Sequence, residues 1–265
     1  MASQRVVLKR PHFQYETRLL SQGIAVIAGL DEVGRGTLAG PVVAGVAVLP
    51  PFLADPLAVT NAPARRSAAW KASLEGTGWV SLINDSKKLT PAQREEAYAS
   101  LCENCVAYGT GACDAADIDR IGIVAATRLA MARAVEMIDP LPGHLLIDAL
   151  DLPAVNIPQT GIIKGDATSL SIAAASIIAK VTRDRLMATV LDAQYPGYGF
   201  AGHKGYGSAE HIAALYRLGP SPIHRLSFAP VREALEARRT GHTKPPERAA
   251  HDRAPQDESI AEPTR

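Results

Sequence analysis

Two short apolar runs joined by a charged, glycine-rich link restrict the fold of this chain more than any other feature. The first run, residues 24–30, leads into two adjacent carboxylates, Asp31 and Glu32, and the second run spans residues 41–49. Short apolar runs bounded by glycine and proline are typical of buried strands. We therefore expect an antiparallel hairpin with both acids near its turn.

The position of these acids suggests a ligand. An unpaired carboxylate at the end of a buried strand costs several kcal/mol or changes its protonation state. A metal ion or a cationic ligand would offset that cost. A surface turn with solvated acids is the alternative, and this stretch alone leaves both interpretations open.

The composition favours a folded chain without a strong overall charge. Hydrophobic residues make up 47% of the 265 residues, and the formal net charge is +1. Binding to nucleic acid would therefore need a local basic patch. Since no apolar run has the length of a membrane span and residues 1–20 lack the apolar core of a signal peptide, we expect a cytoplasmic protein that does not act at a membrane.

The three cysteines predict neither a zinc site nor a redox site. Cys102 and Cys105 form a C-x-x-C pair, but no histidine or second pair lies at a suitable spacing for a structural zinc ion. A thioredoxin-like pair would begin a helix, whereas this pair follows one. We expect these residues and Cys113 to be buried or partly buried free thiols.

The rest of the pattern predicts an α/β fold with a mixed five-stranded sheet. A T-x-x-Q capping box at Thr90 begins a helix that ends near Asn104. The small residues around 171–180 favour close packing of a helix on the sheet. Further strands are expected at 106–112, 145–148 and 161–164, and helices at 114–138, 168–194, 208–217 and after 228, with a glycine-rich loop at 195–206.

The order of these elements predicts where the acids meet. The first three strands form an antiparallel meander, and a helical crossover returns the fourth strand parallel to the first and beside it. The ends of these two strands then bring Asp31 and Asp148 together, while Asp166 follows the fifth strand. We also expect residues 1–23 to form a short helix or arm, residues 50–78 an insertion loop, and residues 240–265 a disordered tail.

Clustered carboxylates suit hard divalent cations such as Mg²⁺ or Mn²⁺, and two such ions promote in-line displacement at a phosphodiester. One difficulty is that neighbours on a regular strand, such as Asp31 and Glu32, point to opposite faces. A strand break at Gly34 would let both contribute. Asp166 precedes a helix, so it is either a helix cap or a metal ligand.

Basic residues that flank the acidic motifs provide candidate contacts to an anion. Each one alone is more commonly a solvated surface charge, and Lys180, Arg183 and Asp184 could simply form pairs along a helix. Tyr206 could stack on a sugar, donate to a hydroxyl or pack locally. The candidate cations are Arg35, Lys87, Lys88, Lys164, Lys180, Arg183, Lys204 and Arg225.

Two rival functions remain at this point. A small-molecule enzyme could bind phosphate in the loop at 34–40, but that loop lacks the lysine and Ser/Thr of a P-loop. A non-catalytic nucleic-acid-binding module would not need four acids at strand ends. Both rivals predict that Asp31→Asn leaves function largely intact.

A series of segments resembles the signature of the type 2 ribonucleases H, the ribonuclease HII family. They occur in the family's order and cover roughly residues 24–49 and 81–231. The matching segments are DEVGRG at 31–36, LAGPVV at 38–43, NDSKKL at 84–89, ID at 147–148, KGD at 164–166, AASIIAKVTRD at 174–184, HKGY at 203–206 and HRLSF at 224–228.

The resemblance implies a ribonuclease H-like fold with a C-terminal helical extension over residues 1–239. It implies cleavage of RNA in RNA–DNA hybrids and incision 5′ to single ribonucleotides in duplex DNA, with 3′-hydroxyl and 5′-phosphate ends. Such a monomeric enzyme would serve ribonucleotide and primer removal in DNA replication and repair. Two Mn²⁺ or Mg²⁺ ions would be held by the residues matching the family's acids, Asp31, Glu32, Asp148 and Asp166.

The resemblance also implies which residues contact substrate. The segment Gly34-Arg35-Gly36 and Tyr206 would recognise the ribose 2′-hydroxyl, the group that distinguishes RNA from DNA. Lys87, Lys180 and Lys204 would contact phosphates. Residues 50–78 are longer than the family leads us to expect, and the charged tail after residue 239 has no counterpart.

Overall fold

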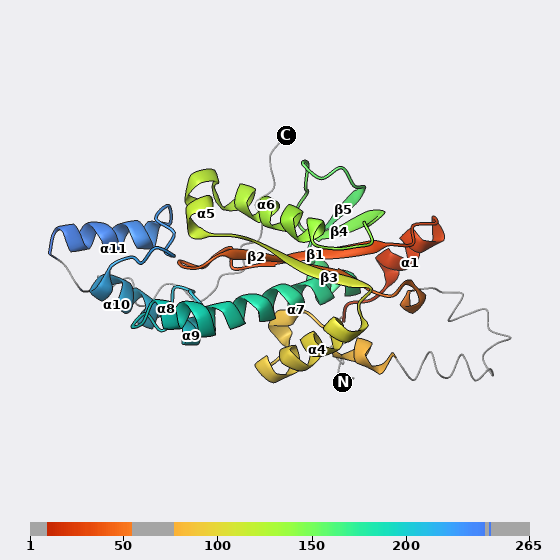
Figure 1. Cartoon of the computed structure of the whole chain (residues 1–265), viewed down its shortest axis with the longest axis horizontal. Helices are drawn as coiled ribbons and strands as arrows, with labels where there is room; N and C mark the ends of the chain where they lie inside the picture. The colour runs from red at the N-terminus through yellow and green to blue at the C-terminus, as the bar shows by residue number, and fades with distance from the viewer. Residues whose placement is uncertain (1–9, 55–76, 242–243, 245–265) are drawn as a thin grey trace, which may run out of the picture. The chain divides into compact units, whose positions relative to one another are not determined.

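The computed structural model describes residues 10–54, 77–241 and 244 (Figure 1). Most of the predicted insertion and nearly all of the predicted tail lie outside these residues. The chain divides into two compact units, and the first contains residues 1–35 and 41–186. The second contains residues 36–40 and 187–265.

The first unit is built on a five-stranded sheet in the order β3-β2-β1-β4-β5. Strands β1, β2 and β3 are antiparallel neighbours, β4 runs parallel to β1, and β5 runs parallel to β4. The predicted meander and the predicted parallel return strand are both confirmed. The strands are β1 Ile27–Val33, β2 Val42–Val48, β3 Ala107–Cys113, β4 His144–Asp148 and β5 Gln159–Ile162.

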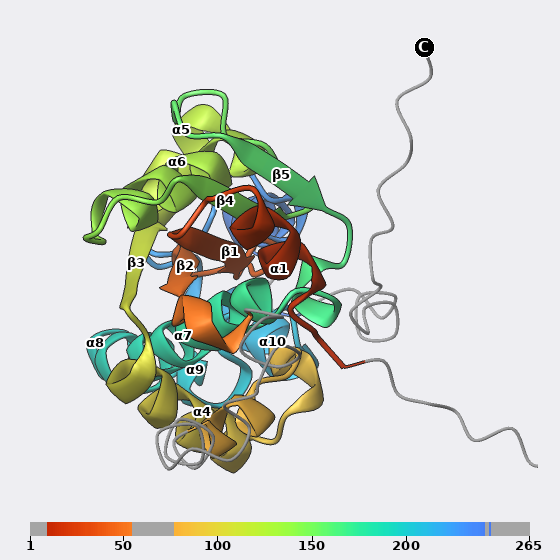
Figure 2. The same ribbon diagram turned by 90° about the vertical axis from the view of Figure 1, so that its right-hand side faces the viewer.

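Helices cover both faces of this sheet (Figure 2). Helix α7 packs on β1 and β2, α6 packs on β3 and β2, and α4 packs on α7 on the side away from the sheet. The predicted capping box of α4 is present at Thr90. The helices of this unit are α1 Gln14–Ser21, α4 Pro91–Asn104, α5 Ala115–Ile121, α6 Ile123–Glu136 and α7 Leu170–Arg185.

Glycines allow α7 to approach the sheet closely. A Cβ atom at Gly29 would lie 2.1 Å from the backbone carbonyl carbon of Ser171, and one at Gly45 would lie 2.3 Å from the carbonyl oxygen of Ala175. No larger residue fits at either position without moving the helix backbone. The close packing expected from the small residues of this helix is therefore confirmed.

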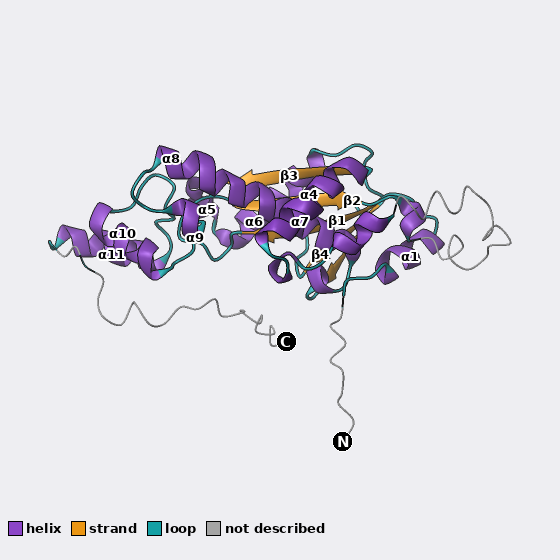
Figure 3. Ribbon diagram, turned by 90° about the horizontal axis from the view of Figure 1, so that it is seen from below, coloured by secondary structure: helices purple, strands orange, loops and turns teal. Residues whose placement is uncertain are grey.

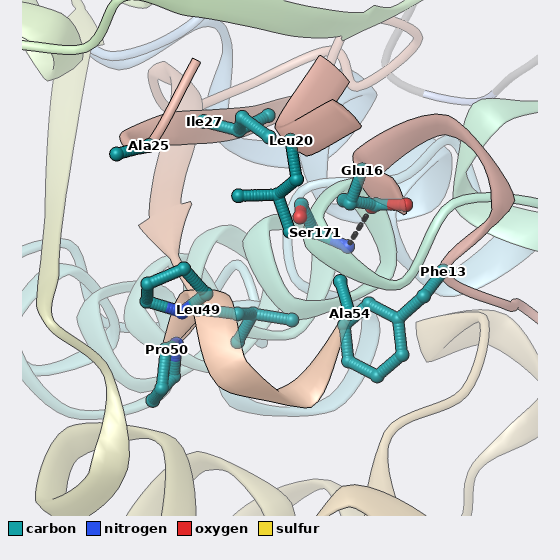
Figure 4. A pocket seen from close by; sticks show the side chains of 10 residues that line it. Phe13, Glu16, Leu20, Ala25, Ile27, Leu49, Pro50, Ala54 and Ser171 are labelled. Atoms are coloured by element: carbon teal, nitrogen blue, oxygen red, sulfur yellow. Dashed lines mark hydrogen bonds between the residues drawn. The ribbon is translucent and has the colours of Figure 1, made fainter. Parts of the chain in front are cut away.

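Helix α1 is joined to the N-terminus of α7 by a buried carboxylate (Figure 4). Glu16 accepts hydrogen bonds from the Ser169 hydroxyl at 2.7 Å and from the Ser171 backbone N–H at 3.0 Å. Phe13 and Leu20 line the small apolar pocket around it. Negative charge at a helix N-terminus is favourable because the first amides lack intrahelical partners.

Three predicted segments differ from the structure. The helix expected at 114–138 is two helices, α5 and α6, because Gly122 between them adopts a left-handed conformation with φ of 80°. The helix expected at 168–194 is interrupted: α7 is followed by a π-helical segment, Leu186–Leu191, and a short helix α8, Asp192–Gln194. The loop expected at 195–206 contains a short helix α9, Phe200–His203.

The described part of the second unit is mainly helical and includes residues 36–40. Helices α10, Ala209–Leu218, and α11, Ala229–Arg239, confirm the two predicted C-terminal helices. Figure 3 shows helices α8, α9, α10 and α11 of this unit in purple. Leu38 packs among buried apolar residues of these helices. Its backbone N–H donates to the Gly205 carbonyl at 2.8 Å, so the 36–40 segment is an integral part of this unit.

The cysteines are free thiols, as predicted. Cys113 is buried, whereas Cys102 and Cys105 are partly buried. Burial raises the pKa of the Cys105 thiol to about 12, which opposes formation of a reactive thiolate. Within the described ranges, the chain forms no helix with the length and apolar character needed to cross a membrane.

Candidate active site

The ends of β1 and β4 bring two of the predicted acids to one edge of the sheet. The parallel register pairs Leu30 with Ile147, so the next residues, Asp31 and Asp148, leave the sheet side by side and on the same face. Asp31 is also opposite Gly45 on β2, on the face that α7 covers. Only 6% of Asp31 is exposed.

Glu32 occupies the neighbouring position, and the alternation of a regular strand directs its Cβ atom to the other face. Its charge still raises the pKa of Asp31 and of Asp148. Strand β1 ends at Val33, so the break predicted at Gly34 is present. Asp31 and Glu32 nevertheless both lie before this break, within the regular strand. One Glu32 oxygen accepts a hydrogen bond from Arg35 at 3.1 Å. The other oxygen is buried without a hydrogen-bond partner among the described residues.

Asp148 and Asp166 are connected through Gly165. The Gly165 backbone N–H donates to the Asp148 carboxylate at 2.6 Å, and Asp166 follows in a buried 3₁₀ turn. The N-cap of α7 is Ser169, whose side chain accepts a hydrogen bond from the first turn of the helix. Asp166 is therefore not the cap of α7, and that alternative interpretation is excluded.

Burial and mutual repulsion disfavour the charged forms of these acids. Burial raises the pKa of Asp31 well above its ordinary value, and the charges of Glu32, Asp148 and Asp166 raise it further. Burial, followed by the charge of Asp166, raises the pKa of Asp148 to about 6. Burial also raises the pKa of Glu32, although Arg35 opposes this. The cluster thus holds more negative charge than its surroundings compensate.

Lys87 is a second cation at the cluster, in addition to the Arg35 that contacts Glu32. Its ammonium group lies 3.3 Å from the Asp166 carboxylate, and Asp85 accepts a hydrogen bond from its backbone N–H. Partial burial of the ammonium group opposes its charge, but Asp166 and Asp31 outweigh this effect and raise the pKa of Lys87 above its ordinary value. Lys87 therefore lies at the acidic site, and its predicted contact with a phosphate stays a prediction.

The donor set fits a hard divalent cation. Carboxylate oxygens are the ligands that Mg²⁺ and Mn²⁺ prefer, and the unpartnered Glu32 oxygen and the raised pKa values both indicate missing positive charge. In the part of the chain that the structure describes, no three His, Cys, Asp or Glu side chains are already placed to hold one ion. The carboxylates would therefore have to turn toward an incoming cation.

Several other predicted cations do not face this site. Arg183 is fully buried, and its guanidinium group donates to the Pro41 carbonyl at 2.8 Å. Arg225 is also fully buried and donates to the Gly40 carbonyl. The prediction that these two arginines contact an anion is therefore wrong, because their guanidinium groups hold backbone carbonyls inside the protein.

Two of the predicted lysines are held in local ion pairs, and a third has an unusual backbone conformation. Lys180 forms an ion pair with Asp184 at 2.9 Å, which is the helix pair weighed from the sequence. Lys88 pairs with Asp85 at 3.6 Å. Lys164 adopts a left-handed conformation at the start of the turn that carries Asp166.

Gly34 packs against the buried Arg183. It has φ of 89°, and a Cβ atom there would lie 2.3 Å from the Arg183 Nε atom. Both observations require glycine at this position. Gly36, Lys204 and Tyr206 belong to the second unit, where 38% of the Tyr206 residue is exposed.

Three polar residues that are buried near predicted site residues were not assigned a role from the sequence. Asp85 anchors the turn that carries Lys87, and its position two residues before a pair of lysines was a usable signal. His211 and His224 lie against the Tyr206 loop in the second unit. No spacing in the sequence shows that two histidines 13 residues apart are hydrogen-bonded.

Comparison with known proteins gives a consistent result. Residues 81–231 match a family model described as ribonuclease HII. The chain is 47% identical over 226 residues to ribonuclease HII of Dehalococcoides mccartyi, an alignment that covers 85% of this chain and 96% of the relative. It is 51% identical over 222 residues to ribonuclease HII of Geobacillus thermodenitrificans, covering 84% of this chain and 75% of the relative.

Solved structures share the fold. Ribonuclease H2 from Pyrococcus horikoshii has a TM-score of 0.58 at 27% identity, covering 81% of this chain and 99% of that chain. A Bst-RNase HIII structure in complex with Mn²⁺ has a TM-score of 0.53 at 20% identity, covering 83% and 72% of the respective chains. The second likeness concerns the fold alone.

Proposed function

The chain belongs to the ribonuclease HII family, and on that basis we propose that the carboxylate cluster of Asp31, Glu32, Asp148 and Asp166 is its catalytic centre. Its activity is the endonucleolytic cleavage of RNA in RNA–DNA hybrids, a hydrolase reaction. The observation that carries the assignment of the site is the convergence of these acids at one edge of the sheet, with pKa values raised by burial and by one another.

The acids are proposed to hold two divalent cations, Mn²⁺ or Mg²⁺, during the reaction. When bound, such ions would activate the attacking water and stabilise the leaving oxygen of an in-line displacement. The chain itself contributes fixed ligands: β1 and β4 position Asp31 and Asp148, and the Gly165 N–H orients the Asp148 carboxylate. Lys87 lies beside Asp166, where its positive charge would favour an approaching phosphate.

The finer substrate preference is also a proposal. We expect incision 5′ to a single ribonucleotide in duplex DNA, with 3′-hydroxyl and 5′-phosphate products. Gly34, Arg35, Gly36 and Tyr206 would contact the ribose, and Lys180 and Lys204 would contact phosphates. The left-handed backbone of Gly34 and the exposed ring of Tyr206 are compatible with these roles.

The proposed setting is that of a monomeric, cytoplasmic enzyme that removes ribonucleotides and primers during DNA replication and repair. Its partners would be RNA–DNA hybrids and duplex DNA that contains ribonucleotides. The family relationship supports the RNA–DNA hybrid as the substrate.

A non-catalytic nucleic-acid-binding role is disfavoured by the same geometry. Carboxylates that are buried together repel a phosphate backbone unless a cation lies between them. The other rival, a small-molecule enzyme that binds phosphate in the loop at 34–40, is disfavoured as well. The N–H groups of Gly40 and Leu38 already donate to backbone carbonyls and are not available to a phosphate.

The test is cleavage of a labelled RNA–DNA hybrid with Mn²⁺ or Mg²⁺, beside a chelator control and Asp31→Asn. Cleavage that needs the ion and falls at least about a thousandfold in the variant would support the proposal, since removing a catalytic group costs several factors of ten. Equal cleavage by Asp31→Asn would refute the assignment of the site.

A further inference from the structure

A buried histidine network in the second unit supports the loop that carries Tyr206. His211 and His224 are at most 2% exposed, and their Nε2 atoms lie 3.0 Å apart. The His203 ring stacks on the His211 ring with 4.3 Å between centroids. Phe200, which is fully buried, packs edge-on against both His203 and His211.

The hydrogen bonds of this network assign the proton on each ring. The Ser221 backbone N–H donates to Nδ1 of His224 at 2.9 Å, so the proton of the neutral His224 ring is on Nε2. That Nε2–H donates to Nε2 of His211, which leaves the His211 proton on Nδ1. The His211 Nδ1–H then donates to the Tyr206 carbonyl at 2.8 Å. The Ser221 hydroxyl oxygen also lies 2.8 Å from His224 Nδ1, and from that atom onward each ring N–H meets an acceptor in one direction.

Both rings remain neutral in this arrangement. Burial, followed by the neighbouring histidine charges, lowers the pKa of His211 to about 4 and that of His224 to about 3. Neutral rings are required, because a second proton on either ring would place two N–H groups against each other.

The backbone around Tyr206 is fixed at each polar group. Its N–H donates to the His203 carbonyl at 2.9 Å, and its carbonyl accepts from the Ser208 N–H at 2.8 Å as well as from His211. The preceding Gly205 N–H donates to His203 Nδ1 at 3.1 Å. The Tyr206 ring extends from this fixed backbone and is partly exposed.

We propose that His211 and His224 are positioning residues, whose hydrogen-bonded chain from Ser221 to the Tyr206 carbonyl holds the Tyr206 ring in the orientation needed to contact ribose. This inference rests on the proposed function, in which Tyr206 contacts the sugar. Preorganisation of a contact residue raises the rate because less ordering remains to be done when the substrate binds.

The test measures kcat/KM for cleavage of duplex DNA that contains one ribonucleotide. His211→Ala and His224→Ala should each lower kcat/KM about tenfold, the effect of losing about one buried hydrogen bond. In a Tyr206→Ala background the same two substitutions should have no further effect, since the ring that they position is gone. His144→Ala is the matched control, because this histidine bonds Thr160 in the first unit.

Two substitutions of one histidine separate positioning from filling of space. His211→Asn keeps a donor near the Nδ1 position and should recover most of the activity. His211→Gln reaches toward His224 instead and should remain as slow as His211→Ala. Thermal unfolding of each variant shows whether the protein is folded, and nitrogen NMR of the wild-type rings should show a proton on Nδ1 of His211 and on Nε2 of His224.

Different failures point to different errors. Equal losses with and without Tyr206, equal activity of His211→Asn and His211→Gln, or the opposite ring tautomers would overturn the positioning role. Full activity of Tyr206→Ala would overturn both the sugar contact and this inference. Full activity of Asp31→Asn would overturn the proposed catalytic centre, independently of the histidines.

Discussion

At the scale of single residues, the cluster is defined by carboxylates that the fold holds in an unfavourable electrostatic position. Asp148 illustrates this, because burial and Asp166 raise its pKa to about 6 from an ordinary value of 3.8. The folded protein therefore binds this proton more tightly than the unfolded chain does. Ionisation of Asp148 lowers stability above pH 6, and the loss disappears below the ordinary pKa.

The first prediction follows from this difference. Without divalent ions, Asp148→Asn should raise the free energy of unfolding at pH 8 by up to about 3 kcal/mol, since one pKa unit corresponds to about 1.4 kcal/mol. The gain should fall to a small fraction of this value at pH 4, close to the ordinary pKa. Urea unfolding at both pH values measures it, with the exposed Asp151→Asn as the matched control. A variant that is less stable than the wild type at pH 8 would contradict the electrostatic account.

Lys87 leads to the second prediction. Lys87→Met removes the ammonium group beside Asp166 and leaves a side chain of similar length. We expect slower cleavage, by about tenfold, and a weaker dependence of kcat/KM on salt, because one contact to phosphate is lost. Lys88→Met is the matched control, since Lys88 pairs with Asp85. Equal effects of the two substitutions would show that only the general surface charge matters.

The sequence could predict the acids but not their environment. Asp31 and Asp148 were predictable because each follows an apolar strand and the strand order makes those strands neighbours. The role of Asp166 remained ambiguous because a carboxylate before a helix suits both a cap and a ligand. Only the structure shows that Ser169 is the cap and that Arg183 is turned inward.

At the scale of elements, the site depends on how closely α7 packs against β1. Gly29 lies two residues before Asp31 on β1 and on the same face of the sheet. A side chain at Gly29 would overlap the backbone of α7 at Ser171. The small residues of the helix predicted this contact, but not which glycines receive it. The helix break at Gly122 was missed because the apolar periodicity continues across it.

The third prediction tests this packing. Gly29→Ala should destabilise the protein by about 3 kcal/mol, because an overpacked contact with backbone relaxes poorly, and should slow cleavage by moving Asp31. Gly78→Ala is the matched control, since a Cβ atom there has open space. Thermal unfolding and hybrid cleavage measure the two effects. Wild-type stability of Gly29→Ala would show that α7 and β1 have room to separate.

At the scale of the whole molecule, the proposed catalysis requires the folded chain to bind divalent ions. Neither the net charge of +1 nor the composition predicts ion binding, because it depends on the local clustering of acids. The resemblance to one family covered both units, and the family comparison agrees with it. The predicted insertion and tail fall mainly on residues outside the described ranges.

The fourth prediction is a stability change caused by the ion itself. A ligand that binds only the folded state stabilises it by about 2.7 kcal/mol at one hundred times its dissociation constant. Mn²⁺ or Mg²⁺ should therefore raise the Tm of the wild-type protein, and a chelator should reverse the rise. Asp31→Asn should show a much smaller rise. An equal rise in both proteins would place the bound ion elsewhere.

Mapping the cut in a labelled DNA duplex that carries one ribonucleotide is the decisive measurement of the proposed activity. With Mn²⁺ or Mg²⁺, the account predicts a single nick 5′ to the ribonucleotide, with 3′-hydroxyl and 5′-phosphate ends. The same duplex without the ribonucleotide should remain intact. The ribonucleotide-containing duplex should also remain intact when it is incubated with the Asp31→Asn variant. An intact ribonucleotide duplex after incubation with folded wild-type protein and either ion would contradict the claim.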